Sequence, residues 1–329
     1  MSRIRIAILG YGNLGRGVEL AVAQNDDMEL VGIFTRRDPS DIKKARKESL
    51  VYNVKDIMNF KEKVDVLILC GGSASDLLGK SLEYAKHFNT VDSFDNHGKI
   101  PEYFKEMDDT AKEHGNLSLI STGWDPGLFS LNRLISQAVL PSGNSYTFWG
   151  KGLSQGHSEA VRRVEGVKYG VQYTIPIESK VESVRNSENP PYSAAAMHKR
   201  ECYVVAKEGY DKEKIRNTII NMPNYFADYD TTVNFISEEE FLKEHQGMGH
   251  GGFVIRSGVT GIEKENSQIY EFSLKLESNP EFTASVIVAY ARAVHRMATN
   301  GASGAVTVFD IPPALISPVS NEELRKLIL

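Results

Sequence analysis

The chain has 329 residues, 41% of them hydrophobic and 25% charged, and its 38 basic and 43 acidic side chains give a formal net charge of −5. This composition predicts a globular protein of roughly two domains, and the small acidic surplus argues against a nucleic-acid partner. No apolar run approaches the ~18 residues of a membrane span, and the amino terminus does not resemble a signal peptide. With Cys70 and Cys202 as the two cysteines, we expect a cytoplasmic protein with reduced thiols, no membrane partner and no metal site.

The first half of the chain alternates predicted strands with predicted helices. Strands are expected over Arg3–Leu9, Met28–Thr35, Val64–Cys70, Asn89–Ser93 and Leu117–Thr122, and helices over Asn13–Gln24, Leu77–Phe88 and Pro101–His114. This order predicts an α/β fold, a Rossmann-type doubly wound parallel sheet. We assign it to a dinucleotide-binding domain over residues 1–123, completed by C-terminal residues from about 300 to 329.

Beyond Trp124 the alternation stops, and strands predominate. They are expected over Tyr146–Trp149, Val167–Ile175, Glu201–Ala206, Thr231–Ile236, Gly252–Gly258 and Ile269–Leu276, with helices over Asp211–Asn221, Glu238–His245 and Phe282–Thr299. We interpret residues 124–299 as an α+β domain with a mostly antiparallel sheet. The apolar face of Phe282–Thr299 is wide, and it fits burial in a core or in an interface equally well.

A glycine-rich motif links the first strand to the first helix. It reads Gly10-Tyr11-Gly12-Asn13-Leu14-Gly15. Its glycines allow a tight turn, close approach of the backbone to a pyrophosphate, and close helix–strand packing. The motif predicts a dinucleotide site at the helix start, although a glycine-rich turn without a ligand is the alternative.

The end of the second strand indicates which dinucleotide binds. Enzymes that use NAD place an acidic residue there, whereas this chain has Thr35, Arg36 and Arg37. Guanidinium groups suit a 2′-phosphate because they donate paired hydrogen bonds, so we favour NADP over NAD. The alternative is a pair of solvated surface arginines.

Further candidates follow the other strands, at the edge of the sheet where ligands bind. The cofactor candidates are Cys70, Gly71, Gly72, Ser73, Ala74, Asp92, Ser93, Phe94, Ser121, Thr122, Gly123 and Trp124. Asp95 and Asp125 place carboxylates at the same edge, which suits a substrate ammonium group. Asp125 could instead cap a helix that has Pro126 in its first turn, and Asp95 could be a turn residue.

Three segments of the second half combine glycines with aromatic or basic side chains. Residues 146–157 set Trp149 among glycines, which suits a substrate loop or a hairpin with Trp149 in its core. His198-Lys199-Arg200 is a basic triplet, a pattern that most often marks a solvated face. His250 lies in a glycine loop, where a histidine is more often a packing residue than a ligand.

Together these motifs resemble those of the meso-diaminopimelate dehydrogenase family, along essentially the whole chain. The most specific runs are Trp124-Asp125-Pro126-Gly127 and Gly152-Leu153-Ser154-Gln155-Gly156-His157. The resemblance implies an NADP-dependent oxidoreductase of lysine biosynthesis that oxidises the D-configured carbon of meso-2,6-diaminopimelate and releases L-2-amino-6-oxopimelate and ammonia. It also implies a homodimer, in which residues 124–299 form a substrate-binding and dimerisation domain.

The resemblance implies the substrate contacts as well. Asp95 and Asp125, the two catalytic candidates, would hold the amino group that is oxidised, and Gln155 with Gly156 would bind the neighbouring carboxylate. Two tryptophans would contact the substrate and four residues would hold its L-configured end: Trp124 and Trp149, and Thr174, Arg200, His250 and Asn279.

Hydride loss from an amine also needs a proton acceptor. We hypothesise that Asp95 or Asp125 accepts the proton, with His157 as a weaker candidate because imidazole titrates near neutrality. Two alternative functions are a relaxed-specificity D-amino acid dehydrogenase of the same family and a non-catalytic NADP-binding sensor. The Glu-Lys-Pro motif of related sugar oxidoreductases and the His-His-x-x-x-Lys motif of dihydrodipicolinate reductases are absent.

Overall fold

The computed structural model describes residues 3–72, 77 and 79–329. It divides into two compact units, the first comprising Met1–Leu131 with Pro280–Leu329 and the second comprising Asn132–Asn279. In the described part of the chain, no helix combines the length and apolar character that crossing a membrane requires.

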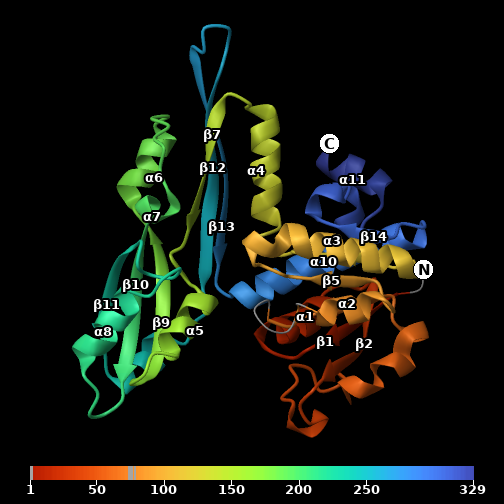
Figure 1. The fold of residues 1–329 in the computed structure, drawn as a ribbon. Helices are drawn as coiled ribbons and strands as arrows, with labels where there is room; N and C mark the ends of the chain where they lie inside the picture. Colours follow the sequence, from red (N-terminus) through yellow and green to blue (C-terminus); the bar gives the residue numbers. More distant parts are fainter. Residues whose placement is uncertain (1–2, 73–76, 78) are drawn as a thin grey trace. The chain divides into compact units, whose positions relative to one another are not determined.

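The first unit is built on a seven-stranded parallel sheet with the strand order β14-β6-β5-β4-β1-β2-β3 (Figure 1). Its strands are β1 (Ile4–Leu9), β2 (Met28–Thr35), β3 (Val51–Asn53), β4 (Val66–Leu69), β5 (Thr90–Asp92), β6 (Leu117–Leu119) and β14 (Gly304–Val306). Its helices are α1 (Asn13–Ala23), α2 (Lys80–Ala85), α3 (Ile100–His114), α10 (Asn279–Thr299) and α11 (Asn321–Ile328). The predicted parallel sheet is thus confirmed, and β3 and β14 are strands that the sequence analysis missed.

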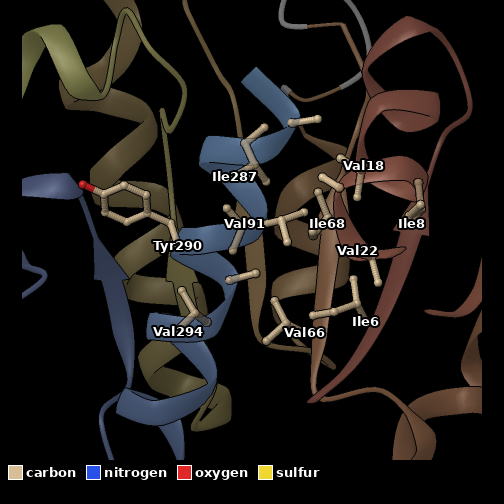
Figure 2. Close-up of a cluster of buried hydrophobic side chains, with 14 of the residues drawn as sticks. Ile6, Ile8, Val18, Val22, Val66, Ile68, Val91, Ile287, Tyr290 and Val294 are labelled. Carbon is tan, nitrogen blue, oxygen red and sulfur yellow. The ribbon is translucent and has the colours of Figure 1, made fainter. Parts of the chain in front are cut away.

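Alternation along the strands gives this sheet two apolar faces. Ile6 and Ile8 of β1 pack with Val18 of α1 and with Ile287 of α10, as Figure 2 shows. Ala7, between the two isoleucines, belongs to the opposite core, which α2 and α3 cover. A strand that is buried on both faces needs apolar residues at successive positions, as β4 has throughout its length.

Helix α10 belongs to the core of the first unit. Ile287, Tyr290 and Val294 are buried in the same apolar cluster as Val18 of α1 (Figure 2), and a Cβ on Gly17 of α1 would lie 2.9 Å from the Cβ of Ala284. The sequence boundaries gave residues 124–131 and 280–299 to the second domain, whereas the structure packs them with the first unit. The physical reason is that the wide apolar face of α10 covers the parallel sheet.

The second unit holds two small sheets. One has the order β11-β10-β9-β8 and the other the order β13-β12-β7. The strands are β7 (Gly143–Trp149), β8 (Gly152–Leu153), β9 (Val167–Pro176), β10 (His198–Ala206), β11 (Asp230–Phe235), β12 (His250–Thr260) and β13 (Asn266–Leu276). All of their pairings are antiparallel except β10 with β11.

The helices of the second unit are short. They are α5 (Gln155–Arg162), α6 (Glu178–Arg185), α7 (Ala194–Met197), α8 (Lys212–Ile220) and α9 (Glu238–Glu244). Helix α4 (Leu128–Val139) begins in the first unit and ends in the second. Because α4 begins at Leu128, Pro126 is not in its first turn and Asp125 is not its N-cap, so that alternative reading of Asp125 is wrong.

Candidate functional site

A cavity of about 440 Å³ lies at the carboxyl ends of β1, β2 and β4 in the first unit. Its volume falls within the usual range for small-molecule sites. Nine of the predicted cofactor residues line it: Gly10, Tyr11, Gly12, Thr35, Arg36, Arg37, Cys70, Gly71 and Gly72. The predicted Ser73 and Ala74 lie outside the described residues.

The glycines of the motif have the geometry that a dinucleotide site requires. A Cβ on Gly15 would lie 2.3 Å from the carbonyl oxygen of Gly10, so only glycine lets α1 pack this closely on the turn. A Cβ on Gly12 would meet nothing within 4 Å, which leaves room for a ligand to approach the backbone. Helix α1 has no side-chain cap at its N-terminus, where backbone N–H groups favour an anion such as pyrophosphate.

Cationic side chains surround the same cavity. Arg36 and Arg37 follow β2, and Lys80 reaches the cavity from α2. The Arg37 guanidinium donates to the carbonyl oxygen of Tyr11, and its backbone N–H donates to Thr35 Oγ1 at 3.2 Å. Both arginines are exposed, and both line the wall of the cavity. This donor set fits a phosphorylated dinucleotide.

Sequence analysis missed part of the cavity lining. Phe34 precedes the arginines, and Leu77, Lys80 and Tyr84 come from the segment that contains α2. The residues of this segment could have been predicted from their place in the chain. The helix that follows a central strand of such a sheet begins at the edge where ligands bind.

Several predicted cofactor residues do not line the cavity but are buried near the strand ends beside it. Asp92 is fully buried, and its carboxylate accepts hydrogen bonds from the backbone N–H groups of Phe94 at 2.9 Å and Ser121 at 3.0 Å and from the Tyr103 hydroxyl at 2.6 Å. Burial is the largest influence on the Asp92 carboxyl and raises its pKa. The predicted residues that do not line the cavity are Asn13, Leu14, Gly15, Asp92, Ser93, Phe94, Ser121, Thr122, Gly123 and Trp124.

Asp95 and Asp125 follow two neighbouring strands of the parallel sheet. Strands β5 and β6 pair in parallel, and the Thr122 N–H donates to the Asp92 carbonyl at 2.9 Å, which ties the two strand ends together. Asp95 is exposed and Asp125 is half-buried. Trp124 is buried and packs edge-on against Phe129 with ring centroids 5.2 Å apart, which fixes the base of the loop that carries Asp125.

In the second unit, Thr174 and Arg200 are direct partners on β9 and β10. The Arg200 guanidinium donates to the Thr174 hydroxyl and lies 4.1 Å from the centre of the Tyr229 ring. Arg200 is 8% exposed and, within the described chain, forms no ion pair, while its buried Nε has no hydrogen-bond partner. Burial lowers the pKa of Arg200 from its ordinary value, as expected for a cation held away from water.

His250 lies beside this pair. Gly152 of β8 pairs with Thr174, and a Cβ on Gly152 would lie 2.4 Å from the His250 ring, so the imidazole packs over the glycine. We call Thr174, Arg200 and His250 the Arg200 group. The structure therefore brings together three residues that are far apart in the sequence.

Two more predicted residues, Asn279 and Gln155, contact Met248, which is close in the chain to His250. The backbone N–H of Asn279 donates to the Met248 carbonyl at 2.9 Å, and the Gln155 amide lies 3.8 Å from the Met248 sulfur. Gln155, Gly156 and His157 form the first turn of α5, a helix that the sequence analysis read as loop. The exposed N–H groups of such a turn favour a carboxylate.

His157 is held by hydrogen bonding and by burial. Its Nδ1 lies 2.8 Å from the Ser154 hydroxyl, and its ring packs against Tyr225 and Phe226. Burial, together with the charge of Arg200, lowers the pKa of His157 to about 4. The imidazole is therefore neutral at pH 7.

Trp149 and His198 form a second contact near the end of β7. The Trp149 backbone N–H donates to His198 Nε2 at 2.9 Å, and the two rings lie 5.3 Å apart. Trp149 is only half-buried, so it does not fill a hairpin core. His198 and Arg200 are buried while Lys199 is exposed, so the triplet alternates along β10 and is not a solvated face.

Similarity to known proteins extends over the whole chain. A family described as "Diaminopimelic acid dehydrogenase C-terminal domain" matches residues 123–278. A meso-diaminopimelate D-dehydrogenase from Lysinibacillus sphaericus is 60% identical over 329 residues, covering 100% of both chains.

Two solved structures are similar to the computed one. The Corynebacterium glutamicum DAP dehydrogenase in complex with DAP has a TM-score of 0.93 and 47% identity, covering 100% of both chains. An engineered D-amino acid dehydrogenase bound to NADP⁺ has a TM-score of 0.88 and 45% identity, again covering 100% of both chains.

Proposed function

The chain belongs to the family of meso-diaminopimelate D-dehydrogenases, and from that premise we propose how its own residues carry out the reaction. The enzyme oxidises the D-configured carbon of meso-2,6-diaminopimelate with NADP⁺. The carbon loses a hydride, its amino group loses a proton, and water then converts the imine to L-2-amino-6-oxopimelate and ammonia. This reaction belongs to lysine biosynthesis by the diaminopimelate pathway.

The first unit would hold the cofactor. Backbone groups of the glycine turn suit the pyrophosphate, and Thr35 with Arg36 and Arg37 suits a 2′-phosphate, since all three residues line the cavity. When bound, the nicotinamide ring supplies the hydride acceptor. The chain's own residues must then orient the substrate carbon and accept a proton.

Asp95 and Asp125 would bind the amino group at the D end. Their placement after two paired strands supports this role, because both carboxylates belong to one edge of the sheet. Negative charge there would stabilise the iminium character that develops as hydride leaves. One of the two would accept the amine proton, directly or through water, and the first turn of α5, with Gln155 and Gly156, would bind the adjacent carboxylate.

The Arg200 group would anchor the L end. The observation that supports this role most strongly is that Arg200 is buried without a counter-ion in the described chain. A buried cation requires an anion, and a planar guanidinium can bind both oxygens of a carboxylate. Asn279 and the His250 ring would complete this end, and Trp124 and Trp149 would wall the substrate.

The test is NADPH formation with each stereoisomer of diaminopimelate and with simple D-amino acids. We expect turnover with the meso isomer and much less with the L,L and D,D isomers, because only one end of the substrate fits the Arg200 group. Comparable turnover of simple D-amino acids would favour the relaxed-specificity alternative. No turnover with any isomer, together with NADPH binding, would favour the sensor.

We further propose that the enzyme is a homodimer located in the cytoplasm. The resemblance to the family supports both the dimer and the location. Light scattering after gel filtration tests the assembly, because a monomer has a mass of 36.6 kDa and a dimer has twice that mass.

A further inference from the structure

A buried carboxylate in the first unit takes no part in the proposed reaction. Glu19 lies on α1, is 1% exposed, and does not line the cofactor cavity. We propose that Glu19 is a positioning residue for 2′-phosphate recognition: it fastens the segment after Arg36 and Arg37 to the glycine turn. This inference rests on the proposed use of NADP.

The first observation concerns the segment between β2 and β3. Glu19 Oε2 accepts the backbone N–H of Ala45 at 2.9 Å, and Oε1 accepts the N–H of Arg46 at 3.0 Å. Two consecutive backbone donors thus bind one carboxylate, as a backbone nest binds an anion. The Ser49 hydroxyl near the end of the segment helps to lower the pKa of this carboxylate. One side chain therefore holds the middle of this segment.

The second observation joins this segment to the cofactor turn. The Tyr11 hydroxyl donates to Glu19 and itself lies 2.8 Å from the Ala45 backbone nitrogen. Tyr11 stands between Gly10 and Gly12, and its carbonyl oxygen accepts the Arg37 guanidinium. The path from Glu19 to Arg37 therefore runs through two hydrogen bonds, and its intermediate residue lines the cavity.

The chemistry of the contacts requires a carboxylate at position 19. Burial alone would raise the pKa of Glu19, but the hydrogen bonds from Ser49, Tyr11 and the two backbone amides outweigh it and lower the pKa. The group is therefore ionised at neutral pH and presents acceptors only. A glutamine of the same shape would turn an N–H₂ toward a tyrosine hydroxyl or a backbone N–H, and it would leave a buried donor without an acceptor.

The experiment measures binding of two nucleotides that differ by one phosphate. Calorimetry gives Kd for adenosine 2′,5′-bisphosphate and for AMP with the full-length wild type and with Glu19→Gln. We expect Kd for the bisphosphate to rise about tenfold, as for loss of hydrogen bonds to a charged group. We expect Kd for AMP to change much less, and KM for NADP⁺ to rise while kcat is largely retained.

A matched control separates positioning from general destabilisation. Asp27→Asn weakens the ion pair between half-buried Asp27 and buried Arg292 in the same unit, which lies at the opposite end of β2. This control should lower stability and leave the ratio of the two Kd values unchanged. If Glu19→Gln does not fold, Tyr11→Phe keeps the carboxylate and removes the bridging hydroxyl, and it should shift the ratio in the same direction.

The outcomes are distinct. If binding of both nucleotides weakens equally, or if binding weakens in neither Glu19→Gln nor Tyr11→Phe, the role of Glu19 is overturned and the use of NADP is left intact. A wild type that binds AMP as tightly as the bisphosphate would overturn the proposed cofactor and this inference together.

Discussion

The cofactor cavity is lined by strand ends and loops that follow one another along the first part of the chain, from the glycine turn to α2. The Arg200 group instead draws one side chain each from β9, β10 and β12, and strand pairing brings these residues together. Backbone groups and exposed cations suit a cofactor that exchanges at every turnover. A buried guanidinium that forms no ion pair among the described residues suits recognition of one substrate end. Under the proposed roles, the first unit would carry the chemistry and the second would discriminate between the two ends of the substrate.

The largest effect that tests this difference between the two units is expected from removing a carboxylate of the first unit. Asp125→Asn and Asp95→Asn should each lower kcat by about 10²-fold or more, because general-base catalysis and iminium stabilisation are both lost. Steady-state kinetics at saturating substrate measure the effect. Asp109→Asn, an exposed position on α3, is the control that should retain kcat. Near-normal turnover in both site variants would remove the proposed role.

The second unit should respond in KM and in selectivity instead. Arg200→Ala should raise KM for meso-diaminopimelate about 100-fold, because the buried charge pair between Arg200 and the substrate carboxylate is lost. The preference of the enzyme for the meso isomer over the other stereoisomers should also decrease. Lys199→Ala changes the exposed neighbour on the same strand and should leave both quantities unchanged. Unaltered kinetics of Arg200→Ala with the meso isomer would contradict the anchoring role.

Much of the first unit could be predicted from the sequence because its signals are local. The glycine motif and Arg36 with Arg37 lie at fixed spacings along one βαβ unit, and they line the observed cavity. Asp92 and Phe94, at the end of β5, were predicted for the same edge, but both are buried and do not line the cavity. A strand-end position does not reveal which way a side chain points.

Several strands and helices of the second unit could be predicted from the sequence pattern, but its site residues could be predicted only through resemblance. No spacing rule joins Thr174 to Arg200, because their contact depends on the register of β9 against β10. The first turn of α5 was also missed, since Gly152 and Gly156 make residues 150–157 read as loop. Helix α10 was apolar enough to be recognised, but its sequence could not tell which sheet it covers.

Cofactor selectivity tests the first unit with a smaller expected effect. Arg36→Ala should raise KM for NADP⁺ by about tenfold or more and change KM for NAD⁺ little, because only NADP⁺ carries the 2′-phosphate. Parallel titrations with the two cofactors measure the change. Arg16→Ala, an exposed position on α1 that does not line the cavity, serves as the matched control. A loss shared equally by both cofactors would contradict the assignment of Arg36 to the phosphate.

The smallest expected effect concerns pH and the second unit. The pKa of His157 is lowered to about 4 in the folded protein, whereas an unfolded histidine titrates near about 6.5. As pH falls through this window, the unfolded chain binds a proton that the folded chain does not, so stability is lost. Urea unfolding at pH 7 and at pH 5 gives the free energy of unfolding at each pH. We expect this free energy to decrease between pH 7 and pH 5 in both proteins, and the decrease should be about 1–2 kcal/mol smaller in His157→Asn than in the wild type.

The control for this pH effect is His114→Asn, an exposed position on α3. It should keep the pH dependence of the wild type. An identical loss of stability in His157→Asn and the wild type would show that the His157 imidazole is not held neutral by its surroundings.

The central claim is that the enzyme oxidises the D-configured carbon while the Arg200 group holds the L end. The most direct measurement uses meso-diaminopimelate carrying deuterium at only one of its two α-carbons. Mass spectrometry of the reduced cofactor then shows which carbon supplied the hydride. We predict that deuterium from the D centre appears in NADPH and that deuterium at the L centre remains in the product. Transfer of deuterium from the L centre would contradict the account.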